Sequence, residues 1–170
     1  LSLEKMKRQQ LTIFLDETEA ISIESIRRKF NPRQYRLIKS HITLCREDEI
    51  EDFRLIESNL GKIDMEQFEL KINGLKRFSE GKGVLITITD EKNQFRKLRE
   101  LILQNKNSTP REHKAHITIM HPRNSICDDE KFRVIQKFEL PKKLSVKKIS
   151  FIEQEIGKEW RTLNEYELKR

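Results

Sequence analysis

The sequence has no apolar run long enough to cross a membrane, and no hydrophobic segment follows the basic residues near its amino end. A transmembrane helix needs about 20 predominantly apolar residues, and a secretory signal needs an apolar core of its own. Only two cysteines are present, Cys45 and Cys127, without the spacing of a zinc site and too few for a disulfide framework. These absences predict a cytoplasmic protein that is neither secreted nor anchored to a membrane.

Glycine is also scarce, with five residues in the chain and no glycine-rich loop between a predicted strand and a predicted helix. P-loop and Rossmann proteins need such loops, because their backbone N–H groups must approach a phosphate closely. No cluster of His, Cys, Asp or Glu at ligand spacing stands out either. The sequence therefore argues against both of these nucleotide-binding folds and predicts a site without a metal or a cofactor.

Charged residues make up 37% of the sequence and apolar residues 35%, with a formal net charge of +7. This composition is typical of a foldable, highly charged protein, and the positive charge favours anionic partners such as nucleotides or RNA. The basic residues are spread along the chain, which favours a solvated surface over an extended nucleic-acid groove. A length of 170 residues suits one compact domain or two small lobes that share a core.

One motif occurs twice: residues 39–44, Lys-Ser-His-Ile-Thr-Leu, return almost unchanged as residues 114–119, Lys-Ala-His-Ile-Thr-Ile. Side chains alternate between the faces of a strand, so strands over 35–45 and 114–120 would each bury their aliphatic residues on one face. The opposite faces would carry Lys39, His41 and Thr43 in one strand, and Lys114, His116 and Thr118 in the other. A single His-x-Thr is weak evidence, but two of the four histidines carry this motif, and chance explains that poorly.

The predicted elements repeat in the same order as the motif. In the first half we expect strand 11–15, helix 19–30, strand 35–45, a helix from 47 to about 60 and strand 68–72, followed by a loop at Asn73-Gly74. In the second half we expect strand 84–89, helix 95–103, strand 114–120 and a short helix from 128, with strands at 144–153 and 160–168 completing the chain. The acidic pair after the first strand recurs 74 residues later, and the motif histidine recurs 75 residues later.

This repeat predicts an α+β fold of two pseudo-symmetric β-α-β-α-β lobes, with the active site in a cleft between their sheets. We expect a single bilobal domain over residues 1–170. Lobe one would span about 10–75 and lobe two about 83–155, and a C-terminal strand would follow at about 160–168.

The two His-x-Thr motifs resemble those of the two-histidine (2H) phosphoesterases, a superfamily that includes the 2′-5′ RNA ligase-like cyclic phosphodiesterases. The resemblance extends over roughly residues 10 to 168. It implies a bilobal enzyme that acts on a 2′,3′-cyclic phosphate at an RNA end or on a nucleotide. It also implies that His41 and His116 are the acid and the base, and that Thr43 and Thr118 donate hydrogen bonds to the phosphate.

The residue types suit this chemistry without a metal. Opening a cyclic phosphodiester requires a proton to leave the attacking water and another to reach the departing sugar oxygen, and two imidazoles can do both. Lys39 and Lys114 could add positive charge near the phosphate, although lysines at strand ends are often only surface residues. We expect a monomer that hydrolyses cyclic phosphates of RNA or nucleotides, with 2′-5′ RNA ligation as a further activity. One alternative is a module that binds such phosphate ends without turnover, and another is an enzyme for a different phosphoester, such as a small nucleotide derivative.

Four other residues near the motifs have less specific patterns. His113 and His121 lie at odd offsets from His116, so we interpret both as structural or exposed. Tyr35 flanks the first motif and could contact a base. Trp160 is expected to anchor the core beside the last strand.

Overall fold

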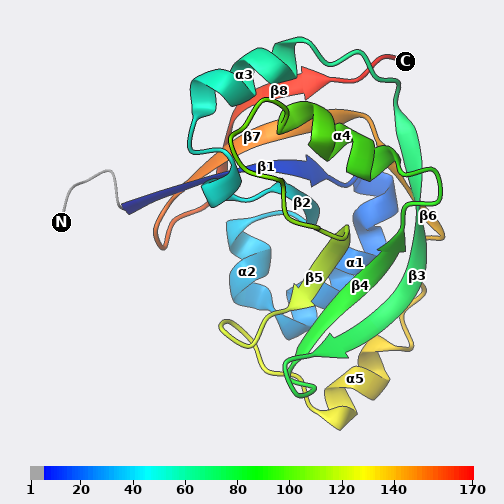
Figure 1. The fold of residues 1–170 in the computed structure, drawn as a ribbon. Helices are drawn as coiled ribbons and strands as arrows, with labels where there is room; N and C mark the ends of the chain where they lie inside the picture. The colour runs from blue at the N-terminus through cyan, green and yellow to red at the C-terminus, as the bar shows by residue number, and fades with distance from the viewer. Residues whose placement is uncertain (1–5) are drawn as a thin grey trace.

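A computed structural model describes residues 6–170, which form two four-stranded antiparallel sheets and five α-helices (Figure 1). The first sheet has the order β2-β1-β7-β8, from strands β1 (Lys7–Phe14), β2 (His41–Cys45), β7 (Lys148–Glu155) and β8 (Arg161–Glu167). The second has the order β5-β4-β3-β6, from β3 (Phe68–Phe78), β4 (Gly83–Thr89), β5 (His116–Met120) and β6 (Lys143–Val146). The helices are α1 (Glu17–Phe30), α2 (Pro32–Leu37), α3 (Phe53–Gly61), α4 (Gln94–Ile102) and α5 (Asp129–Ile135), with a 3-10 turn at Glu47–Glu49.

The two sheets are built alike, and each has a motif strand at one edge. β1 pairs with β2 through Thr12 and Thr43, then Phe14 and His41. β4 pairs with β5 in the same way, and Thr87 lies opposite His116. The prediction of an α+β fold with two pseudo-symmetric lobes is therefore confirmed.

The strands do not divide between the sheets as the two halves of the sequence do. β3 falls in the first half of the chain, but it pairs with β4 and β6 in the second sheet. β7 and β8 come from the carboxyl end and complete the first sheet beside β1. The sheets are thus not separated at the predicted lobe bounds of 10–75 and 83–155. Alternation of apolar residues tells which face of a strand is buried, but it does not tell which strand lies beside it.

Several predicted elements have different bounds in the structure. The strand predicted over 35–45 was wrong in its first part, because Pro32 at the first position of α2 starts a helical turn that ends at Leu37. The helix predicted from 47 begins instead at Phe53, after the 3-10 turn. Asn73 and Gly74 lie within β3 at a shift of register and form no loop. The strand predicted over 144–153 is two strands, one in each sheet.

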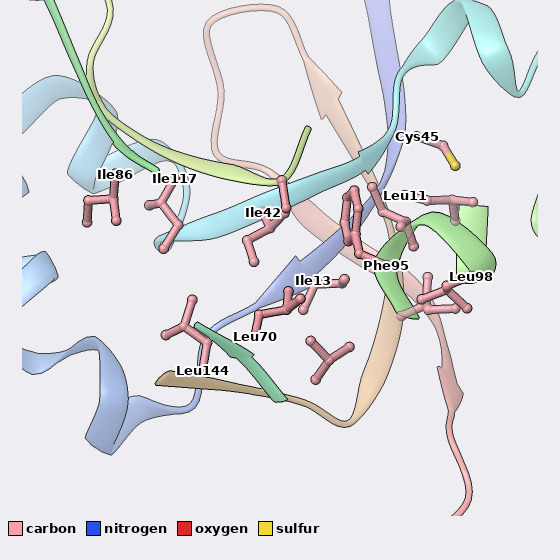
Figure 2. Close-up of a cluster of buried hydrophobic side chains, with 14 of the residues drawn as sticks. Leu11, Ile13, Ile42, Cys45, Leu70, Ile86, Phe95, Leu98, Ile117 and Leu144 are labelled. Carbon is pink, nitrogen blue, oxygen red and sulfur yellow. The ribbon is translucent and has the colours of Figure 1, made fainter. Parts of the chain in front are cut away.

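The aliphatic faces of both sheets belong to one hydrophobic cluster (Figure 2). Ile42 and Ile117, the residues between the histidine and the threonine of each motif, are almost fully buried in it. Phe95 and Leu98 of α4 belong to the same cluster. Because Ile42 and Ile117 share this core, their burial fixes which face of each motif strand turns away from it.

Among residues 6–170, no helix combines the length and the apolar character that a membrane crossing requires.

Candidate active site

The motif strands β2 and β5 lie against each other where the two sheets meet. In both strands the His and Thr side chains are partly buried, and the aliphatic residues between and after them are fully buried. His41 and Thr43 therefore share one face of β2, and His116 and Thr118 share the corresponding face of β5. The alternation predicted for the two motifs is confirmed.

The two imidazoles are held by the same hydrogen bond. Nδ1–H of His41 donates to the carbonyl oxygen of Lys39 at 2.8 Å, and Nδ1–H of His116 donates to that of Lys114 at 2.9 Å. A carbonyl oxygen can only accept, so the Nδ1 atom of each ring must carry the proton. Each Nε2 atom is then free either to take a proton or to give one up.

The two motif lysines orient the imidazoles through their backbone carbonyl groups. β2 begins at His41 and β5 begins at His116, so Lys39 and Lys114 precede the strands, and the prediction that they lie on them was wrong. Both lysine side chains are exposed, and Nζ of Lys39 lies 3.9 Å from a carboxylate oxygen of Glu17. A phosphate contact from either ammonium group stays a prediction.

The pKa of His41 is far below that of an exposed histidine. Burial is the main cause that lowers the pKa of His41 to about 4; the positive charge of Arg27 acts in the same direction, and the hydrogen bond to Lys39 opposes it. The charge of His116 also lowers the pKa of His41, which shows that the two rings are within electrostatic reach of each other. His41 is therefore a neutral imidazole at pH 7.

A buried ion pair in α1 supports the segment that leads into His41. The Arg27 guanidinium donates to a carboxylate oxygen of Glu24 at 2.5 Å and to the carbonyl oxygen of Ile38 at 2.7 Å. The backbone N–H of Ser40 donates to the same Glu24 oxygen at 3.0 Å. The chain on the amino side of His41 is thus held by a charged pair, of which the Arg27 side chain is almost fully buried.

Each motif strand also carries a β-bulge, and a side chain from the other half of the chain binds the bulged residue. Leu11 pairs with Cys45 and Thr12 with Thr43, so Leu44 is the extra residue in β2, and Ile119 is its counterpart in β5. Nη1 of Arg99 in α4 donates to the Leu44 carbonyl at 2.5 Å. Nδ2 of Asn31, at the end of α1, donates to the Ile119 carbonyl at 3.0 Å. Both donors are buried, so each motif strand is held by a residue of the opposite half.

Arg99 also forms the most buried ion pair of the described residues. Its guanidinium makes two bonds with the Glu49 carboxylate, at 3.1 and 2.7 Å, and both side chains are about 95% buried. Burial acts to raise the pKa of Glu49, but hydrogen bonds from Arg99 and from the Arg46 amide lower it overall. The sequence alone does not identify Asn31, Glu49 and Arg99 as residues of the site, because nothing in their local pattern distinguishes them from surface polar residues.

The two motif threonines have hydroxyls available to a ligand. Within residues 6–170, neither Thr43 Oγ1 nor Thr118 Oγ1 has a side-chain hydrogen bond, in contrast to Thr87, whose hydroxyl donates to the Gly74 carbonyl at 3.1 Å. Hydroxyls in this position can donate to the non-bridging oxygens of a phosphate.

A cavity of about 1060 Å³ lies beside His41 but does not enclose the histidine pair. Its wall includes Phe14, whose ring meets the His41 ring edge-on at 6.2 Å between centroids. Tyr35 and Trp160 also line it, so Trp160 borders a cavity and is not an anchor within the core. This volume lies slightly above the roughly 300–1,000 Å³ range of small-molecule pockets.

In the part of the chain that the structure describes, no three His, Cys, Asp or Glu side chains come close enough together to hold a metal ion. Metal-independent chemistry stays a prediction for experiment.

The family model of the 2′-5′ RNA ligase superfamily matches residues 15–158, and the chain belongs to this superfamily. Three solved structures share its fold at low sequence identity. The structure of E. coli LigT complexed with 3′-AMP has a TM-score of 0.67 at 17% identity, over 97% of this chain and 99% of that one. A structure described as a phosphoesterase has a TM-score of 0.68 at 14% identity, over 96% and 99% of the two chains. TT0787 of Thermus thermophilus has a TM-score of 0.58 at 16% identity, over 95% and 98%.

Comparison with curated proteins finds no significant match.

Proposed function

We propose that the protein is a metal-independent phosphodiesterase that opens 2′,3′-cyclic phosphates at RNA ends or on nucleotides. The single observation that carries this proposal is the matched pair of imidazoles. His41 and His116 have the same Nδ1–H tautomer and come from two strands that lie together, so two free Nε2 atoms are available. This arrangement suits a reaction in which one base and one acid act on a single phosphate.

His41 is the better candidate for the base. Because burial lowers its pKa to about 4, its Nε2 is unprotonated at pH 7 and can accept a proton from the attacking water. The water oxygen forms a bond to phosphorus while the bond from phosphorus to one ribose oxygen breaks. Protonated His116 delivers its Nε2 proton to that departing oxygen, and the product is a phosphomonoester beside a free hydroxyl.

Thr43 and Thr118 would donate hydrogen bonds to the non-bridging oxygens, where negative charge grows in the transition state. A 5′-hydroxyl in place of water would give a 2′-5′ phosphodiester when the bond from phosphorus to the 3′ oxygen breaks, and we propose RNA ligation as a further activity of the same site. The cavity beside His41 has the size and the aromatic wall to accept a nucleoside attached to the phosphate. The LigT complex with 3′-AMP supports a nucleotide ligand for that relative.

The second candidate is a module that recognises phosphate ends without turnover. A binding site needs only hydrogen-bond donors and positive charge, whereas an unprotonated imidazole at pH 7 is a base and adds little to phosphate affinity. The pair of imidazoles with the same Nδ1–H tautomer and free Nε2 atoms therefore favours the enzyme.

The test is a turnover assay with 2′,3′-cyclic mononucleotides and with oligoribonucleotides that end in a cyclic phosphate, resolving which hydroxyl keeps the phosphate. His41→Ala and His116→Ala should each lower kcat by roughly 10²–10⁴-fold, the usual loss for a general acid or base, and should change affinity far less. Wild-type turnover in both variants would refute the catalytic assignment. A wild-type protein that binds these ligands and turns over none of them would establish the recognition module instead.

A further inference from the structure

A hydrogen bond from His113 connects the segment that leads into β5 directly to β2. His113 precedes His116 by three residues, and its Nε2–H donates to the backbone carbonyl of Thr43 at 2.8 Å. The bond links residues 70 positions apart in the sequence. The equivalent residue of the first half, three positions before His41, is Ile38, which has no imidazole to offer. The first half of the chain therefore offers no equivalent of this hydrogen bond.

The His113 ring is also packed against His116. The two rings meet edge-on, with 5.7 Å between their centroids and an angle of 60°. Behind His113 lies Phe95 of α4, with ring centroids 6.1 Å apart, and Phe95 is 2% exposed. His113 is thus held between the hydrophobic core and the candidate acid.

The protonation state of His113 is compatible with this bond. Burial lowers the pKa of His113, and the nearby positive charges of Arg99, His116 and Arg46 lower it further. His113 is therefore a neutral imidazole at pH 7, with its one proton on the Nε2 atom that faces the Thr43 carbonyl.

We propose that His113 is a positioning residue that sets the place of the His41–Thr43 strand relative to His116. The proposal rests on the function proposed above. Thr43 follows His41 by two residues on the same face of β2, so a shift of its carbonyl moves both side chains relative to His116. Reacting groups must be held within about 0.5 Å of their productive geometry, and a displacement of about 1 Å can reduce the rate by about 10²-fold.

Two variants of His113 separate its hydrogen bond from its bulk. His113→Leu removes the donor and fills part of the space, whereas His113→Gln keeps a side-chain N–H with a reach close to that of Nε2. His121→Leu is the matched control. His121 is also a partly buried histidine whose ring meets a phenylalanine ring edge-on, Phe78 at 5.7 Å. Its Nδ1 accepts from Arg123 and makes no bond to either motif strand.

In cyclic-phosphate opening, His113→Leu should lower kcat by roughly 10–100-fold and leave KM within about threefold of the wild type. His113→Gln should restore most of kcat, and His121→Leu should match the wild type. The proposal is overturned if His113→Leu keeps wild-type kcat. It is also overturned if His113→Gln, folded and as stable as the wild type, is as slow as His113→Leu.

Crystal structures of the wild type and the two His113 variants provide a readout that does not depend on turnover. The distance from the Thr43 carbonyl to the His116 ring should change by more than about 0.5 Å in His113→Leu and stay unchanged in His113→Gln. An unchanged distance in both variants refutes the positioning role. A wild type without turnover refutes the proposed function, and the distances still decide whether His113 sets the geometry of the pair.

Discussion

Lowering the pH should destabilise the protein through His41 well before its carboxylates are protonated. The ordinary histidine pKa is 6.5, whereas burial lowers the pKa of His41 in the folded protein to about 4. Between these values the unfolded chain binds a proton at His41 that the folded protein does not bind. The contribution of neutral His41 to stability is therefore complete above pH 6.5 and is lost as the pH falls towards 4. For these two pKa values, the loss is about 2 kcal/mol at pH 5.

The measurement is urea unfolding of the wild type and of His41→Gln, which cannot titrate, at pH 7 and at pH 5. The free energy of unfolding should fall by about 2 kcal/mol more in the wild type than in the variant over this interval. Comparing the two proteins cancels the titration of every other group. An equal fall in both would refute the depressed pKa and the burial argument behind it.

The same pKa predicts the pH dependence of activity. kcat/KM reports the ionisation of the free enzyme, so its acid limb should lie near pH 4, where His41 becomes protonated and can no longer act as a base. An acid limb near 6.5 would show that His41 titrates like an exposed histidine and would refute its lowered pKa.

Three further predictions follow from the site and its support. Thr43→Val and Thr118→Val each remove a hydroxyl at nearly constant shape. Each variant should lower kcat by about 10²-fold and should also bind the substrate more weakly. Wild-type kinetics in both variants would exclude the phosphate contact. Turnover should survive EDTA, and activity that is lost in EDTA and returns with zinc, magnesium or manganese would contradict the two-histidine mechanism. Glu49→Gln leaves the buried Arg99 without its charge partner and should lower the free energy of unfolding, measured in urea, by roughly 3–5 kcal/mol. Glu69→Gln breaks an exposed pair with Lys143 and should have a much smaller effect, so equal losses in the two variants would refute the distinction between buried and exposed pairs.

The fold class and the motif strands could be predicted because their signal is local and occurs twice. Alternation over five residues places Ile42 and Ile117 in the core, and the structure buries both almost completely. The start of β2 could not be predicted from alternation alone, because Pro32 starts a helical turn in a stretch that otherwise reads as extended.

The support of the site was not predictable, because its contacts are distant in sequence. Arg99 and Leu44 are 55 residues apart, and Asn31 and Ile119 are 88 apart. Each donor is an ordinary polar residue in its local context. What marks it is burial against the carbonyl of a bulged residue, and this contact forms only when the two halves pack together.

The sequence by itself determined the chemical groups and the face of the strand on which each lies, because the period of a strand is set by local backbone geometry. The tertiary structure alone decided the exchange of strands between the sheets, the low pKa of His41 and the bond from His113 to Thr43. The reason is that burial, electrostatic fields and hydrogen bonds depend on distance in space, and folding brings together residues that the sequence keeps far apart.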